Sequence, residues 1–150
     1  MQDTPSVLLG IDEAIERSHQ ACAAFVNGDP EPLKVVFSHH DDATIANPFG
    51  PPARGWKNVE ETFERAATNW HGGSAEGFDL VTKYETPELA FTVEIERYIA
   101  KVGDQNELAP VALRVTQVYR IEEGAWKIVH RHADHITSAR GAESLVEEAR

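Results

Sequence analysis

In the first half of the chain, apolar residues recur every three or four positions, which is the spacing of one buried helical face. A stripe of this kind runs through residues 11–27 and is followed by Gly28 and Pro30, which suit a helix end and the start of the next turn. The residues that follow predict, in chain order, a short helix, a short strand, a loop rich in proline and glycine, and a longer helix, at 33–37, 43–47, 48–55 and 56–70.

The second half of the chain alternates apolar and polar residues, which is typical of strands with one buried face. Four strands are predicted, at 78–84, 91–99, 111–121 and 126–136. In the second of these the apolar residues carry odd numbers, so we expect the odd-numbered face to cover the core. Because helices come first and strands afterwards, the pattern predicts an α+β domain with an antiparallel sheet packed on one side by helices.

The connection between the last two predicted strands indicates their register. Residues 121–125 suit a type I turn followed by a bulge at Gly124, which would place Ile121 opposite Ala125. The even-numbered face then holds four polar and three apolar residues: Arg114, Thr116, His130 and His132, with Val118, Trp126 and Ile128. We expect this face to be buried in a homodimer interface, because the apolar residues need cover and two-fold pairing is the commonest way to supply it. Charging both histidines would weaken such a dimer near pH 5.

Composition and charge narrow the function classes. A chain of 150 residues with 41% hydrophobic and 26% charged residues fits one folded domain, which we expect to span 1–150, with a core at about 8–137 and a loose tail or helix at 138–150. The net charge of −11 argues against nucleic acid and anionic membranes as partners. The lone Cys22 cannot form an internal disulfide, and the chain shows neither a signal peptide nor a bilayer-spanning apolar run. We expect a cytoplasmic protein.

Two segments resemble a known superfamily. The first runs from Asn27-Gly28-Asp29 through Asp41-Asp42-Ala43-Thr44-Ile45 to Asn47-Pro48, and it is similar to ketosteroid isomerases and SnoaL-like polyketide cyclases. The second is the closing strand at 126–134, Trp-Lys-Ile-Val-His-Arg-His-Ala-Asp, which resembles SnoaL-like domains of unassigned function. The association domain of calcium/calmodulin-dependent kinase II has a related ending. The chain therefore resembles the nuclear transport factor 2-like superfamily over about residues 8–137, which implies a cone: a curved sheet wrapped around helices, with a pocket inside.

The resemblance does not carry the isomerase chemistry with it. Ketosteroid isomerases have a proton-shuttling aspartate just before the proline of the first segment, where this chain has Asn47. Their oxyanion tyrosine and their second aspartate fall near Ala21 and Gln117. Because asparagine is no general base at neutral pH and alanine has no donor, steroid isomerisation by the usual mechanism is not expected.

Five polar residues are candidates for contact with a ligand: Asn47, Arg97, Gln117, Tyr119 and Arg131. All but Asn47 interrupt a predicted apolar sheet face, which is the pattern of an apolar pocket with a few polar anchors, and Asn47 is an uncharged polar group that could line such a pocket. The two arginines are the more suggestive, because an arginine on a core-facing surface is rare unless it is paired. Each could anchor a carboxylate or another anion of the ligand, or could pair with an internal Asp or Glu.

Titratable groups at strand ends and loops, His71, Asp134 and His135, are candidate catalytic residues near the predicted pocket mouth. His130, His132 and Asp134 share one strand face, an arrangement that could hold zinc or could form a polar layer at a dimer interface. No other compact ligand motif accompanies them, so we expect neither a metal nor a cofactor.

These observations leave three functions open. The first is a homodimeric domain that binds a small hydrophobic ligand with one anionic or carbonyl group. The second is an isomerase, hydrolase or cyclase that acts on a small hydrophobic carbonyl compound. The third is an oligomerisation module.

Overall fold

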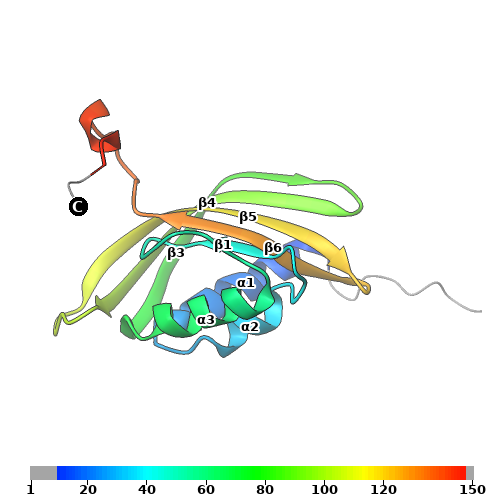
Figure 1. Ribbon diagram of the computed structural model, residues 1–150, viewed down its shortest axis with the longest axis horizontal. Helices are drawn as coiled ribbons and strands as arrows, with labels where there is room; N and C mark the ends of the chain where they lie inside the picture. The colour runs from blue at the N-terminus through cyan, green and yellow to red at the C-terminus, as the bar shows by residue number, and fades with distance from the viewer. Residues whose placement is uncertain (1–9, 148–150) are drawn as a thin grey trace, which may run out of the picture.

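The computed structural model describes residues 10–147 and shows helices packed on one side of a curved sheet (Figure 1). The helices are α1 (Ile11–Phe25), α2 (Glu31–Val36) and α3 (Trp56–Ala67), with a short 3-10 helix, η1 (Ala142–Leu145), near the C-terminus. The strands are β1 (Thr44–Ala46), β2 (Ala53–Arg54), β3 (Trp70–Glu85), β4 (Leu89–Val102), β5 (Ala109–Glu122) and β6 (Ala125–Asp134). The predicted α+β class and the cone-like curvature are confirmed.

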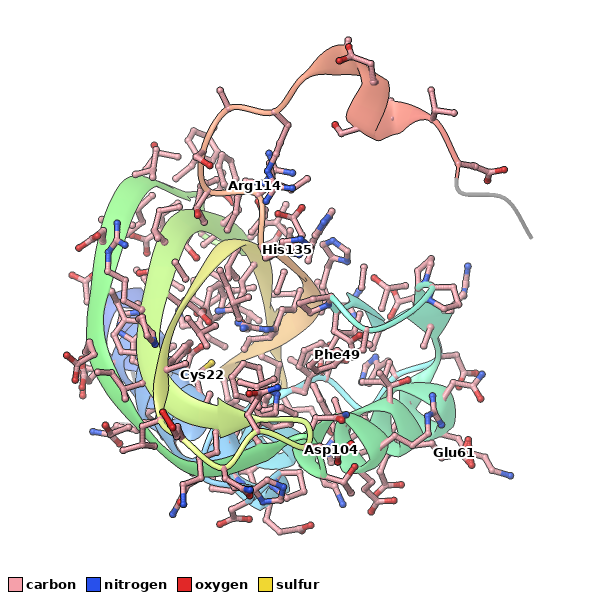
Figure 2. The ribbon with its side chains drawn as sticks, turned by 90° about the vertical axis from the view of Figure 1, so that its left-hand side faces the viewer. Cys22, Phe49, Glu61, Asp104, Arg114 and His135 are labelled. Atoms are coloured by element: carbon pink, nitrogen blue, oxygen red, sulfur yellow. The ribbon has the colours of Figure 1, made fainter. Side chains whose placement is uncertain are left out.

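The six strands form one sheet in the order β2-β1-β6-β5-β4-β3. The long strands β3 to β6 are antiparallel to their neighbours, whereas β1 pairs with β6 in parallel, so the sheet is mixed rather than wholly antiparallel. β3 begins at Trp70, where we had expected the end of a helix, and it absorbs the glycines at 72 and 73 through a register shift between His71 and Ser74. The sheet is unclosed, and its concave side receives the helices (Figures 1 and 2).

The face of β4 that covers the core is the opposite of the one predicted. Its even-numbered residues are buried: Ala90, Thr92, Glu94, Glu96, Tyr98 and Ala100. Phe91, Val93 and Ile95 lie half-buried on the convex face instead. The reason is that the acidic residues of the inner face have basic partners inside the fold, Glu94 with His19 and Glu96 with Arg131.

The β5–β6 hairpin also differs from the predicted register. Its turn has two residues, Glu123 and Gly124, both with positive φ (52° and 81°), so that Glu122 and not Ile121 lies opposite Ala125. Further along, Tyr119 pairs with Ile128 and Val118 pairs with His130, so one residue of β6 is skipped between the two pairs. After this register shift, the residues of β6 from His130 onward face in the directions that were predicted.

This register leaves part of the predicted convex face correct. Arg114, Thr116, His130 and His132 point away from the helices as expected, because their buried neighbours in β5 and β6 alternate with them. Trp126 and Ile128, which were predicted to share that face, turn inward: Ile128 is fully buried, and Trp126 packs against the core.

The chain leaves β6 on the side of the sheet opposite to the helices, and η1 projects away from the body (Figure 1). The ends of the predicted domain and tail, at 1–9 and 148–150, lie outside the described residues. Within residues 10–147, no helix has the length and apolar character needed to cross a membrane.

Candidate functional site

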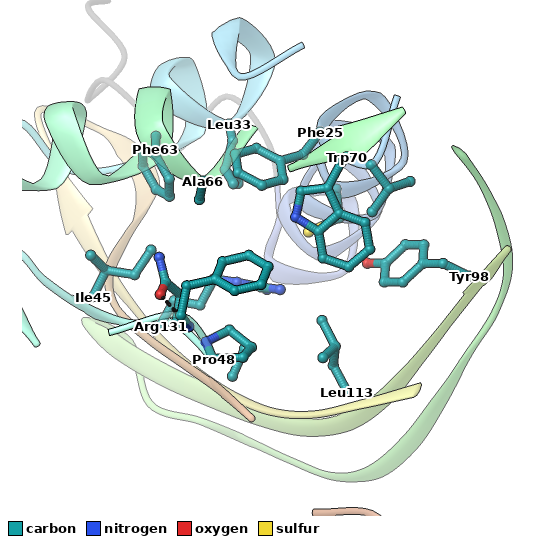
Figure 3. A pocket seen from close by; sticks show the side chains of 15 residues that line it. Phe25, Leu33, Ile45, Pro48, Phe63, Ala66, Trp70, Tyr98, Leu113 and Arg131 are labelled. Carbon is teal, nitrogen blue, oxygen red and sulfur yellow. Dashed lines mark hydrogen bonds between the residues drawn. The ribbon is translucent and has the colours of Figure 1, made fainter. Parts of the chain in front are cut away.

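A small apolar cavity lies between the helices and the concave face of the sheet (Figure 3). It exists because the apolar stripes of α1 and α3 and the inner residues of β3, β4, β5 and β6 face one another across it. Its volume is about 40 Å³. Fifteen residues line it: Cys22, Phe25, Val26, Leu33, Ile45, Asn47, Pro48, Phe49, Phe63, Ala66, Trp70, Tyr98, Leu113, Arg131 and Ala133.

The cavity's strongest polar group is Arg131, which β6 holds on the concave face. Its guanidinium forms a two-pronged ion pair with Glu96 of β4, with Nη1–Oε2 and Nη2–Oε1 distances of 2.9 and 2.7 Å. Glu96 is 0% exposed, and the Arg131 side chain is 9% exposed. Two unlike charges that are buried this deeply must satisfy each other, because neither has enough water around it.

A hydrogen-bond network surrounds this ion pair. The Tyr98 hydroxyl donates to Glu96 Oε1 over 2.7 Å, and Arg131 Nη1 also donates to Gln117 Oε1 over 2.8 Å. The Gln117 amide nitrogen in turn donates to Ser18 Oγ and to Tyr119 Oη, each over 2.9 Å. In the described part of the chain, no buried side-chain nitrogen or oxygen lacks a partner, so the network is complete as it stands.

The network determines which groups carry charge. Burial alone would raise the pKa of Glu96, but the Arg131 guanidinium and the hydrogen bonds outweigh it, and the pKa lies below the ordinary value. Burial raises the pKa of the Cys22 thiol to about 12, and it raises the pKa of the Tyr98 hydroxyl well above its usual range. At neutral pH the cavity wall therefore carries one compensated arginine, a neutral thiol and a neutral phenol.

The cavity mouth is covered by the loop that follows β1. Asn47 Oδ1 accepts a hydrogen bond from the Phe49 backbone N–H over 2.9 Å, which fixes the first turn of this loop. Phe49 is 48% exposed and lies 6.2 Å from Trp70, centroid to centroid. Its side chain lies between the curved sheet and α3 (Figure 2) and narrows the way into the cavity.

Outside this mouth lies a wider, polar groove. It is bounded by one face of α3 and by the loop from residue 49 to β2, and it offers about 600 Å³ to the centre of a water molecule. Asn47, Phe49 and Ala66 line both the groove and the cavity, so the two spaces adjoin at these residues. Arg54 and Arg65 contribute basic side chains to the groove, and Glu61 contributes an acidic one.

The five residues that were predicted to contact a ligand lie at different distances from the cavity. Asn47 and Arg131 line the cavity. Gln117 is fully buried behind Arg131, and Tyr119 lies beyond Gln117, so both support the site without lining it. Arg97, which we had expected to face the core, lies on the convex face and pairs with Asp79 over 2.7 Å, as the reversed orientation of β4 requires.

The predicted catalytic candidates are not among the cavity's lining residues. Asp134 binds Arg114 through distances of 3.0 and 2.7 Å on the convex face, so its predicted place near the mouth is wrong. Burial raises and Arg114 lowers the pKa of Asp134, with a net decrease. His71 and His135 are exposed, the first in β3 and the second just after β6. Among residues 10–147, no three His, Cys, Asp or Glu side chains form a group that could hold a metal ion.

Sequence reasoning missed Glu96, Tyr98 and Phe49. For the first two, one signal was present, because an arginine that faces inward at 131 needs a buried carboxylate as its partner. β4 supplies that carboxylate only if its even-numbered face, which carries Glu94 and Glu96, turns toward the core. Phe49 carried no signal, because an aromatic residue in a proline-rich loop can lie in many places.

Comparisons with known proteins give the family. A model of the SnoaL-like domain matches residues 13–136. Among solved structures, a nuclear transport factor 2-like superfamily protein from Salmonella enterica is 20% identical, with a TM-score of 0.70 over 88% of this chain and 92% of that one. A ketosteroid isomerase-like protein from Erwinia carotovora is 15% identical, with a TM-score of 0.69 over 85% and 95%. At these identities the likeness shows the fold.

A third solved structure, from Thiobacillus denitrificans, is named for the association domain of calcium/calmodulin-dependent protein kinase type II. It is 18% identical, with a TM-score of 0.64 over 90% of this chain and 98% of that one. The search of curated proteins finds no match to this chain.

Proposed function

We propose that this chain, which belongs to the SnoaL-like domain family, is a homodimeric protein that binds a small, mostly apolar molecule in the cavity beneath Phe49. The observation that carries the proposal is the cavity's lining, which is apolar except for Asn47, Arg131 and two groups that stay neutral, Cys22 and Tyr98. An apolar pocket with a few polar groups is the usual form of a small-molecule site.

The charges beside the cavity indicate which polar group of a ligand would lie next to Arg131. Arg131 is already neutralised by Glu96, so an anion beside it would lose its water and also meet the Glu96 carboxylate. A neutral acceptor such as a carbonyl oxygen avoids both costs. We therefore expect a carbonyl or hydroxyl group of the ligand, rather than a carboxylate, at the Arg131 end.

The ligand enters by displacing Phe49. The space of about 40 Å³ holds only a few water molecules, whereas a bound organic molecule needs several hundred cubic ångströms. Phe49 is half exposed and belongs to a loop rather than to the sheet, so its side chain can swing outward without breaking the core.

A filling substitution tests this proposal. In Ala66→Leu, the larger side chain occupies the cavity from α3, and Ala24→Leu makes the same change on α1 at a position that does not line it. Isothermal titration and thermal shift against a panel of hydrophobic ketones, amides and carboxylates supply the readout. Binding in the parent that persists in Ala24→Leu and disappears in Ala66→Leu supports the proposal. A parent that binds no member of the panel, or that loses binding equally in both variants, contradicts it.

Acid–base catalysis has less support in this cavity. Among the described residues that line it, only Cys22, Tyr98 and Arg131 are ionisable, and none of them accepts a proton at neutral pH. An isomerase, hydrolase or cyclase acting here would need its base from the substrate or from outside the lining. Binding without proton transfer therefore fits the lining better.

The convex face of the sheet supports the homodimer. Phe91, Val93, Ile95 and Val118 stand there half-buried, on the face opposite to the buried residues of β4 and β5. An apolar sheet face of this kind favours a second copy as its cover. The same face would serve a pure oligomerisation module, in which the cavity binds nothing.

Histidine charge should weaken this dimer. Burial, with a smaller contribution from His132, lowers the pKa of His130 below its usual range, so its imidazole is neutral at pH 7.5. Protonating these imidazoles in acid would place positive charge near Arg114, only partly offset by Asp134. Sedimentation should show a tighter dimer at pH 7.5 than at pH 5, and a weaker one in Arg114→Ala, His130→Ala or His132→Ala. A monomer at micromolar concentration, or a dimer that neither pH nor any of the three variants affects, contradicts this interface.

A further inference from the structure

The polar groove outside Phe49 has no role in the proposed function as stated so far. It adjoins the cavity through Asn47, Phe49 and Ala66, yet it is far larger, at about 600 Å³ against about 40 Å³. A molecule whose apolar part enters the cavity past Phe49 would therefore leave its other end in this groove.

Within residues 10–147, no carboxylate forms an ion pair with the basic residues of the groove. Arg65 makes only a 3.4 Å contact to Thr62 Oγ1, and Arg54 only a 3.3 Å bond to the Asp41 backbone carbonyl. By contrast, Arg97, Arg114, Arg120 and Arg131 each hold an Asp or Glu at 2.7 Å. Glu61 is the one acidic residue among the described residues that line the groove. This lining therefore has a net charge of +1, in a chain whose net charge is −11.

We propose that the groove binds the carboxylate of an amphipathic ligand, held by Arg65 and Arg54 while the hydrophobic body passes Phe49 into the cavity. This inference rests on the proposed function, which it deepens by naming the ligand class and its direction. Arginine suits this role because its planar fork matches a carboxylate. The direction follows from charge: the inner arginine is neutralised by Glu96, and the outer two are not.

Octanoate and octanamide form a matched pair of probes, since they share the hydrophobic chain and differ in charge. Their affinities are measured by isothermal titration at low salt in the parent, in Arg65→Gln, in Arg54→Gln and in the double variant. Arg140→Gln is the control, because it removes one positive charge from the segment after β6, away from the groove. Exposed ion pairs are weak, so each groove arginine should contribute about a two- to fivefold preference for octanoate over octanamide. The double variant should bind both probes alike, and 0.5 M salt should reduce the parent's preference.

The outcomes separate this inference from the proposed function. If the parent binds octanamide at least as tightly as octanoate, or if its preference survives the double variant, the groove does not hold the carboxylate, although the cavity still binds the chain. If Arg140→Gln lowers the preference as much as Arg65→Gln does, net charge is the cause and the site is not in the groove. If neither probe binds the parent, the groove site fails, and the proposed function fails with it only if the parent also binds no member of the panel of ketones, amides and carboxylates.

Discussion

The ion pair between Glu96 and Arg131 lends itself to a direct test of what stabilises this fold. In Glu96→Gln the side chain keeps its length and shape but loses its charge. Arg131 then remains buried with no carboxylate. Because the guanidinium donates to both oxygens of Glu96, the amide nitrogen faces one of its N–H donors whichever way the amide is turned. The variant therefore isolates the charge of Glu96 without opening a cavity.

The expected loss follows from the burial of both partners. Because Glu96 is wholly enclosed and Arg131 nearly so, removing one charge should cost about 3–5 kcal/mol of the free energy of unfolding. A domain of this size typically has about 5–15 kcal/mol in total, so the variant should still fold, with a Tm lowered by about 10 °C.

Urea denaturation at pH 7 measures the loss, and Arg97→Gln is the matched control. Arg97 is the neighbour of Glu96 in β4 and has an ion pair of the same 2.7 Å length with Asp79, but that pair is on the exposed convex face. Its removal should cost less than about 1 kcal/mol. A Glu96→Gln loss no larger than that of Arg97→Gln would refute the reasoning that burial makes the inner pair decisive.

The same variant predicts a pH dependence. The pKa of folded Glu96 lies below its ordinary value of 4.5, so its contribution is fully present above about pH 5 and is lost as the pH falls through 4.5 toward the folded pKa. The stability difference between the parent and Glu96→Gln should therefore shrink in acid. A difference that grows as the pH falls would mean that the folded pKa is raised instead.

Three further results are expected. Gly73→Ala should cost about 1–3 kcal/mol in thermal unfolding, because its Cβ would clash with the Val26 carbonyl oxygen. Gly77→Ala meets nothing within 4 Å and should be nearly neutral, so equal losses in the two variants would contradict the close approach. The Cys22 thiol should react with an aromatic disulfide reagent at pH 8 only after unfolding in urea, because burial raises its pKa to about 12; rapid reaction of the native protein would contradict its burial. Phe49→Ala should speed both association and dissociation of octanamide in stopped-flow measurements, and unchanged rates would mean that this ring does not cover the entrance.

Local patterns predicted the elements of this fold well, because each helix carries one apolar stripe. In α1, Ala14, Ser18, Ala21 and Cys22 are buried at the spacing that was read from the sequence. The hairpin was harder, since Glu122-Glu123-Gly124 is compatible with either a two- or a three-residue connection. The chain adopts the two-residue connection, in which Glu123 has a positive φ. The register shift near Val118 that follows could not be predicted from the residues around it.

The candidate site was predictable only in part, for a physical reason. Asn47 and Arg131 were found because each is a polar residue on a segment that had to face inward. Glu96 was not, because its direction depends on a partner 35 residues away in the chain. Glu94 likewise depends on His19, 75 residues away. Period-two alternation shows that a strand has two faces, and it cannot choose between them when both contain apolar groups.

The choice of which face of β4 covers the core links the site to the proposed dimer. Turning Glu94, Glu96 and Tyr98 inward places Phe91, Val93 and Ile95 outward, since neighbouring strand residues alternate between faces. A single choice of face therefore creates both a polar network under the cavity and an apolar convex surface. If that surface is covered by a second copy, the dimer contributes to holding β4 in the orientation that keeps Glu96 beneath Arg131. Substitutions on the convex face that leave the chain monomeric should then lower its thermal stability at equal protein concentration, even though they touch no residue of the cavity.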